Sequence, residues 1–111
     1  GVYQGEPVYI KVWFHADVAG YIKEKIWHES QQVHLRDDGS IIFEAEVAGT
    51  DEIRFWIMTW GSRAEVLEPE SLREEIRAEA EMMASRYEVN TVEEERPTYG
   101  ERPYERPLQR N

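Results

Sequence analysis

The 111-residue sequence contains no cysteine, which excludes disulfide bonds, thiolate zinc sites and cysteine nucleophiles. No apolar run approaches the roughly 18 to 20 residues that a membrane-spanning helix requires, and no signal-peptide pattern opens the chain. We therefore expect a cytoplasmic protein without a membrane contact. The chain begins at Gly1 instead of a methionine, which predicts a fragment of a longer protein.

Positive charge is scarce in the part of the chain that is predicted to fold. Residues 1–90 hold 9 Lys and Arg against 18 Asp and Glu, residues 91–111 hold 4 against 5, and the net charge is −10. Nucleic-acid affinity rests mostly on the neutralisation of phosphates, and an acidic body repels them. The sequence therefore predicts a poor stand-alone binder of DNA or RNA.

Motifs that carry catalysis or hold cofactors are missing as well. No serine lies in a G-x-S-x-G elbow, and there is no glycine-rich loop that would hold a phosphate. The spacing of the three histidines, His15, His28 and His34, matches no metal-binding motif. Adjacent carboxylates such as Asp37 and Asp38 are predicted to lie in solvent, where nothing apolar raises a pKa. We expect no enzyme activity, no cofactor and no metal site.

Alternating apolar and polar residues predict four strands, over residues 8–14, 32–36, 41–47 and 64–67. Between the second and the third, the sequence Asp37–Ser40 predicts a hairpin turn, because Gly39 takes a positive φ at little steric cost. The first strand has an apolar side that consists of Val8, Ile10, Val12 and Phe14.

Apolar residues three or four positions apart predict three helices. The first is expected over residues 17–26, capped by Asp17 or His15, with an apolar face of Val18, Ala19, Ile22 and Ile26. The second begins after Thr50 or Asp51 and ends at Gly61, a C′ glycine; its face, predicted to pack in the core, consists of Ile53, Trp56, Ile57 and Trp60. The third has Pro69 in its first turn and a stripe of Leu72, Ile76, Ala80, Met83 and Tyr87.

This order of elements predicts an α+β fold, a ferredoxin-like βαββαβ sandwich with an extra C-terminal helix and an extended tail. The predicted organisation is a linker over residues 1–7, a domain over 8–90 and a charged tail over 91–111, in which Glu-Arg-Pro occurs three times. In such a sandwich both helices cover one face of the sheet. The other face then exposes Lys11 and a candidate interface of Tyr9, Trp13 and Ile42. We expect either the final helix or a partner subunit to cover this face.

Several stretches of residues 1–90 together resemble one family. They are Gly1–Val8 (GVYQGEPV), Trp27–Gln31 (WHESQ), Asp37–Ser40 (DDGS), Leu72–Ile76 (LREEI) and, as the most specific, Trp56–Pro69 (WIMTWGSRAEVLEP). The sequence resembles the C-terminal WCX extension of bacterial WYL-domain transcriptional regulators. The tail is not covered by the resemblance.

The resemblance implies a regulatory module without enzyme activity. Members of this family carry an N-terminal winged helix-turn-helix that binds DNA and a central WYL barrel that senses ligands, in some members single-stranded nucleic acid. The extension is implicated in dimer contacts. No Trp-Tyr-Leu triplet and no helix-turn-helix can be found here, so we expect both the sensing barrel and the DNA-binding domain to lie outside this sequence. The implied partners are a second copy of the chain and the WYL barrel of the same or the partner chain.

A cationic and aromatic cluster is the other candidate contact. It consists of Lys23, Lys25, Trp27, His28 and Arg36, and it would bind an anionic effector, a nucleotide base or a WYL barrel. The alternative is an ordinary tryptophan at an edge with solvated lysines. A further hypothesis is a sensing module for a small molecule or for single-stranded nucleic acid, with Tyr9 and Trp13 as stacking residues. Glu44 and Glu46 would repel phosphates from that face.

Overall fold

The computed structural model describes residues 6–88. Its elements are β1 (Val8–Phe14), α1 (Ala16–Lys23), β2 (Gln32–Leu35), β3 (Ile41–Val47), α2 (Asp51–Thr59), the short 3₁₀ helix η1 (Gly61–Arg63), β4 (Ala64–Glu68) and α3 (Glu70–Glu88). The predicted mixture of helices and strands is confirmed. The order differs from a plain βαββαβ succession by η1 before β4 and by α3 after it.

The four strands form one antiparallel sheet in the order β2-β3-β1-β4. The two central strands pair along their whole length, and this register places Trp13 opposite Ile42 and Lys11 opposite Glu44. Because side chains alternate between the faces of a sheet, these residues share one face. The edge strand β4 shifts its register between Lys11 and Val12, which is typical of a β-bulge.

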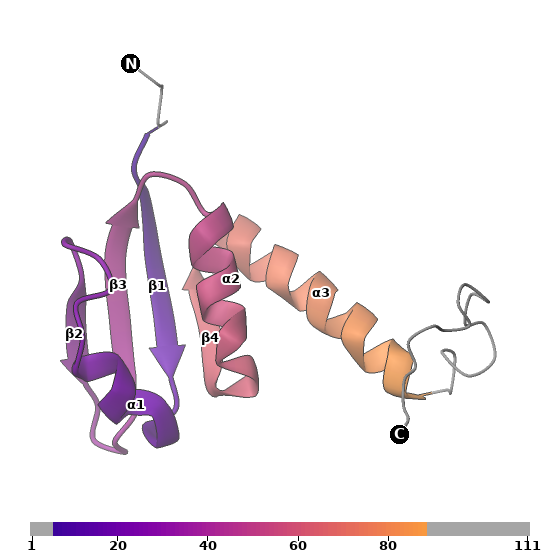
Figure 1. Ribbon diagram of the computed structural model, residues 1–111, viewed down its shortest axis with the longest axis horizontal. Helices are drawn as coiled ribbons and strands as arrows, with labels where there is room; N and C mark the ends of the chain where they lie inside the picture. The colour runs from indigo at the N-terminus through magenta and orange to yellow at the C-terminus, as the bar shows by residue number, and fades with distance from the viewer. Residues whose placement is uncertain (1–5, 89–111) are drawn as a thin grey trace, which may run out of the picture. The chain divides into compact units, whose positions relative to one another are not determined.

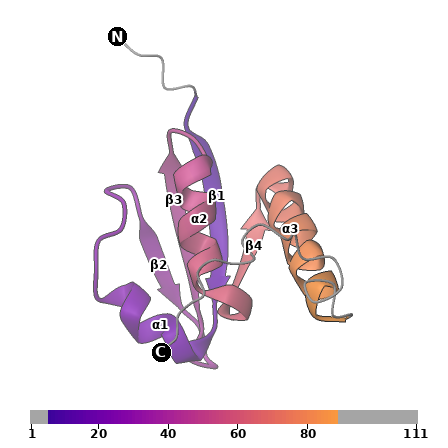
Figure 2. The ribbon, with the colours of Figure 1, turned by 45° about the vertical axis from the view of Figure 1, so that its right-hand side comes forward.

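The core lies on the other face of the sheet, under α1 and α2 (Figures 1 and 2). The central strands β1 and β3 contribute their alternate residues, as the sequence pattern predicts, and α1 and α2 add residues from the helix side. The edge strand β2 contributes only the partly buried Val33. The buried residues are Ile10, Val12, Phe14, Val18, Ala19, Ile22, Ile41, Phe43, Ala45, Val47, Ile57, Val66 and Leu72. Trp56 and Trp60 pack against this cluster and are partly buried, so their predicted place in the core is confirmed.

Helix α1 begins where the sequence predicts but ends earlier. His15 is the N-cap, and its Nδ1 accepts a hydrogen bond from the backbone N–H of Asp17 at 2.9 Å. The predicted extension to Ile26 is wrong, because Ile26 is 78% exposed and lies beyond the last helical residue, Lys23. In a continued helix the carbonyl of Ile22 would accept from the N–H of Ile26. Here the indole Nε1 of Trp27 donates to that carbonyl at 2.9 Å.

The two predicted glycine positions are confirmed. Gly39, in the hairpin between β2 and β3, has φ 90°. Gly61 has φ 59° and follows Trp60, the C-cap of α2. Both values lie in the left-handed region that glycine enters without a steric penalty. Asp38 also stabilises the hairpin, because its Oδ1 accepts a hydrogen bond from the backbone N–H of Ser40 at 2.9 Å. Hydrogen bonds from the side chain and the backbone of Ser40 lower the pKa of the Asp38 carboxyl.

The chain divides into two compact units, Gly1–Ala78 and Glu79–Asn111, and α3 runs across the boundary. Within the first unit Leu72 is buried and Ile76 packs against the core. The later residues of the predicted stripe, which are Ala80, Met83 and Tyr87, are exposed, so burial does not extend along the whole stripe. Pro69 lies just before α3, and its carbonyl accepts from the N–H of Arg73 at 3.0 Å. The predicted tail over 91–111 lies outside the described residues.

Candidate interaction surface

The face of the sheet that α1 and α2 leave uncovered carries the predicted interface residues. Tyr9 is 39% exposed, and Trp13 and Ile42, which are cross-strand partners, are partly exposed. The ring of Trp13 also meets the ring of His15 edge-on, with 5.8 Å between centroids. We call this side the open sheet face; its residues on the central strands are Tyr9, Lys11, Trp13, Ile42 and Glu44.

Glu44 connects two neighbouring strands on the open sheet face. Its Oε1 accepts a hydrogen bond from the hydroxyl of Tyr9 at 3.0 Å, and its Oε2 lies 2.9 Å from Nε2 of His34 on β2. The ionic part of the contact with His34 exists only when the imidazole is protonated. The carboxylate of Glu44 on β3 therefore contacts ring side chains from both neighbouring strands, β1 and β2.

The pKa of Tyr9 responds to this carboxylate. Loss of solvent around the phenol is the largest cause of the shift, followed by the hydrogen bond to Glu44 and by the negative charges of Glu44 and Glu68. Together they raise the pKa of Tyr9 to about 12. Each cause disfavours the phenolate, so the hydroxyl stays a hydrogen-bond donor at every physiological pH.

The loop between α1 and β2 is organised by Gln31, a residue for which the sequence pattern predicts no role. Its Oε1 accepts from the backbone N–H of Trp27 at 2.6 Å and from that of His28 at 3.1 Å. Its Nε2 donates to the carbonyl of Lys25 at 3.1 Å. One side chain thus satisfies three backbone groups of an irregular segment. A lone glutamine carries no sequence signal for such a role.

Ser30 and His28 complete this loop. His28 Nδ1 accepts a hydrogen bond from the backbone N–H of Ser30 at 3.1 Å. Ser30 Oγ accepts from the backbone N–H of Glu46 on β3 at 2.8 Å. The loop is therefore attached to the end of the sheet, and His28 acts in a turn.

Trp27 belongs to an aromatic cluster beneath α2. Its ring centroid lies 5.1 Å from that of Trp56 and 6.3 Å from that of Trp60, and both of these contact Phe14. Lys25 Nζ lies over the Trp27 ring at 5.3 Å from its centroid, a cation–π distance. The Nε1 atoms of Trp56 and Trp60 are buried without a hydrogen-bond partner among the described residues.

The structure brings together only part of the predicted cationic cluster. Lys25, Trp27 and His28 share the loop after α1, and the exposed Lys23 ends that helix. Arg36 lies after β2, in the hairpin, where its Nε is 3.9 Å from Asp38 Oδ1. Gly39 of this hairpin faces the first residue of α1, at the other end of the helix from Lys23.

The three histidines lie in three separate places, and among residues 6–88 no group of three His, Asp or Glu side chains is arranged to hold a metal ion. No helix within the described part of the chain is long and apolar enough to cross a membrane.

A comparison with models of protein families matches the WCX domain over residues 6–84. The matched region is more than half of the chain and includes all four strands. The chain belongs to the WCX domain family. No curated protein matches the chain.

The extent of the match fits the geometry of this WCX domain. It begins two residues before β1 and ends within the last turns of α3. It includes the open sheet face, the loop held by Gln31 and the aromatic cluster around Trp56. The resemblance of the Trp56–Pro69 run is therefore confirmed for the WCX domain.

Proposed function

We propose that this WCX domain is a regulatory and dimerisation module, without enzyme activity, of a bacterial WYL-type transcriptional regulator. The observation that carries the proposal is the WCX match across the sheet and α3. The DNA-binding winged helix-turn-helix and the WYL barrel lie in other parts of such a regulator, which acts in the cytoplasm with its DNA. The acidic charge of the chain supports a role in protein contacts over a role in direct DNA binding.

We also assign the domain to the ferredoxin-like class. The strand order β2-β3-β1-β4 supports this assignment, because β1–α1–β2 and β3–α2–β4 then form two interleaved crossovers that put both helices on one face. The open sheet face of this class is available for partners.

The proposed dimer contact is the open sheet face. Tyr9, Trp13 and Ile42 place aromatic and aliphatic surface on the two central strands, and aromatic residues are enriched where subunits meet. The Glu44 contacts hold Tyr9 in place before association, which reduces the entropy lost on binding. A second copy, or the WYL barrel, is the partner that the family implies.

Light scattering on a sizing column at several concentrations tests this proposal. We expect a dimer that dissociates on dilution, and we expect Trp13→Glu to yield a monomer with retained secondary structure. The matched control is Tyr21→Glu, which changes an aromatic residue that is 65% exposed on α1 and should leave the dimer intact. A Trp13→Glu chain with unchanged dimerisation would exclude the open sheet face as the contact. A chain that stays monomeric at every concentration would count against dimerisation by this module.

A second candidate function is the sensing of a small anionic molecule or of single-stranded nucleic acid at Trp27. The observation that favours it is Lys25 Nζ above the Trp27 ring at 5.3 Å, next to Lys23. Titration of tryptophan fluorescence with a short single-stranded oligonucleotide and with a nucleoside triphosphate tests it. Saturable quenching that Lys25→Glu abolishes would support sensing, whereas quenching that Lys25→Glu leaves unchanged would refute a role for this residue pair.

A further inference from the structure

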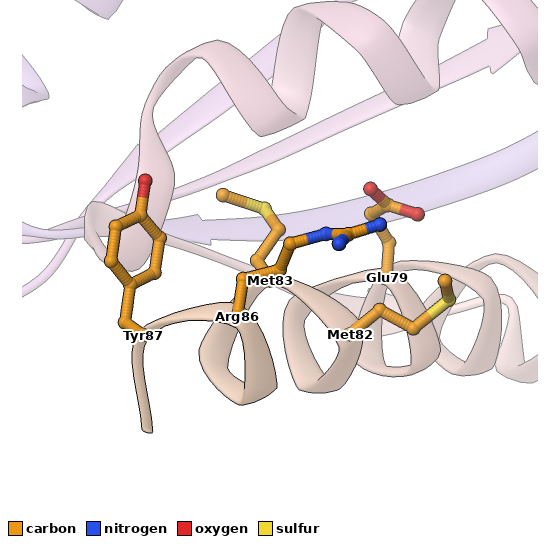
Figure 3. Close-up of a pocket in the computed structure, with 5 residues that line it drawn as sticks. All are labelled: Glu79, Met82, Met83, Arg86 and Tyr87. Carbon is orange, nitrogen blue, oxygen red and sulfur yellow. The ribbon is translucent and has the colours of Figure 1, made fainter. Parts of the chain in front are cut away.

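The last turns of α3 form a hollow of about 230 Å³ on one side of the helix (Figure 3). Within the described part of the chain, its lining residues are Glu79, Met82, Met83, Arg86 and Tyr87. Its three apolar side chains are largely exposed: Met82 is 61% exposed, Met83 51% and Tyr87 88%. Figure 3 shows the Arg86 side chain running along the helix toward Glu79, so both charges border the same hollow.

The spacing of the lining residues has a structural meaning. Glu79, Met82, Met83 and Arg86 stand at positions i, i+3, i+4 and i+7 of one helix. In knobs-into-holes packing, four residues at this spacing form the hole that receives one side chain of a facing helix. The centre of this hole lies between Met82 and Met83, and methionine is a flexible side chain that fills such holes readily.

The charges at the two ends of the hollow select one partner and one orientation. Suppose that a second copy of the helix packs antiparallel, with the two-fold axis between Met82 and Met83. Glu79 then faces Arg86 of the second copy, Arg86 faces Glu79, and the small Ala78 faces the large Tyr87. A parallel arrangement would place Glu79 opposite Glu79 and Arg86 opposite Arg86, which is repulsive.

We propose that residues 79–88 of α3 pair antiparallel with the same residues of a second copy, each helix inserting a methionine into the hollow of the other. This inference rests on the proposed function in one respect, the self-association of the module, but it names a contact distinct from the open sheet face. Ten residues of one helix bury much less than the roughly 800 Å² per partner of a standard interface. The helix pair therefore strengthens a dimer that has another contact.

Introduced cysteines test this orientation without interference, because the natural chain has none. We would prepare the 111-residue chain with Glu79→Cys, Arg86→Cys or Met83→Cys and oxidise the variants mildly, singly and in mixtures of differently tagged proteins. In a mixture of Glu79→Cys and Arg86→Cys chains, antiparallel pairing predicts a disulfide between unlike chains only. For Met83→Cys, it predicts a disulfide between two copies of the same variant. The matched control is Ser85→Cys, an exposed position of the same helix that does not line the hollow, and it should remain largely uncrosslinked.

The outcomes separate this inference from the proposed function. Cross-linking of Glu79→Cys with itself would indicate a parallel pair and would overturn the proposal. A chain that dimerises in light scattering but gives no disulfide between Glu79→Cys and Arg86→Cys would refute the helix contact and leave the open sheet face as the interface. A Met83→Cys yield no greater than that of Ser85→Cys would also refute it.

Charge reversal gives a second, quantitative test of the antiparallel helix pair. Glu79→Arg alone turns two attractive pairs into two repulsive ones, and so does Arg86→Glu alone, so each should raise the dimer dissociation constant about tenfold. An equimolar mixture of the two variants should restore the original constant, since the hetero-pair regains both attractions. Single variants that dimerise as well as the unchanged chain would contradict the antiparallel arrangement.

Discussion

Replacement of Gln31 by alanine should destabilise the domain well beyond what its place in a loop suggests. The side chain accepts two backbone hydrogen bonds, from Trp27 and His28, and donates a third to the carbonyl of Lys25. These bonds hold the segment that seats Trp27 on the aromatic cluster. The variant therefore loses a local network and loosens one side of the core.

The expected magnitude follows from the number of bonds and from their exposure. A net hydrogen bond contributes about 0.5–1.5 kcal/mol to stability, and the two bonded amides, at Trp27 and His28, are partly buried. Water replaces part of what is lost, so we expect Gln31→Ala to lower the free energy of unfolding by about 2 kcal/mol. For a domain of this size, that loss corresponds to a fall of roughly 8–16 °C in Tm.

Urea denaturation followed by tryptophan fluorescence measures this effect, and Gln32→Ala is the matched control. Gln32 is the exposed neighbour on β2, so its replacement should change stability by less than about 0.5 kcal/mol. Gln31→Glu keeps both accepted hydrogen bonds but loses the one donated to the carbonyl of Lys25. Its stability should therefore lie between those of Gln31→Ala and Gln32→Ala. If Gln31→Ala unfolds at the same urea concentration as Gln32→Ala, the loop is not held by this side chain and the reasoning is refuted.

Three further perturbations should change stability in a direction that follows from the backbone conformation or from the electrostatics. Gly20→Ala in α1, where an added Cβ meets no atom within 4 Å, should stabilise the domain by up to about 1 kcal/mol, whereas Gly61→Ala at φ 59° should destabilise it by about 1–2 kcal/mol; thermal unfolding of both variants checks the opposite signs. The pKa of Tyr9, raised to about 12, makes the native state retain a proton that the unfolded state releases near pH 10, so stability should fall as pH rises between these values. Absorbance at 295 nm should show a late-titrating phenol that is missing in Tyr9→Phe, and a chain without that late phase would refute the shift.

The sheet could be predicted from the sequence because its pattern has a period of two residues and one buried face. The alternation in Val8–Phe14 and Ile41–Val47 decides which side chains enter the core, and a shift by one residue would bury Lys11 and Glu44. The same pattern placed Tyr9, Trp13 and Ile42 on the opposite face. Gly39 and Gly61 were predictable for a related reason, since only a few residues tolerate a positive φ.

The end of α1 and the loop after it could not be predicted in the same way. Ile26 continues the helical spacing, but the indole of Trp27 takes the carbonyl that the next helical turn needs. Gln31 then supplies hydrogen bonds across four and six positions in the chain. Such contacts depend on how long polar side chains fold back, which hydrophobic periodicity does not record. For this reason the sequence indicates which residues near Trp27 are cationic or aromatic, but it does not predict how they lie relative to one another.

The apolar stripe of α3 is only partly buried, and truncation of the chain tests which part of it stabilises the fold. Leu72 is 1% exposed and Arg73 donates to Glu65 and to the carbonyl of Val66, so a chain that ends at Pro69 should lose about 3 kcal/mol or more of stability. A chain that ends at Ala78 keeps these contacts and should unfold within about 1 kcal/mol of the full chain while its dimer weakens. Urea midpoints and light scattering on the three chains measure both quantities. If ending at Ala78 costs as much stability as ending at Pro69, the exposed methionines contribute to the fold, and a stripe that continues past the core is not evidence for a second helix.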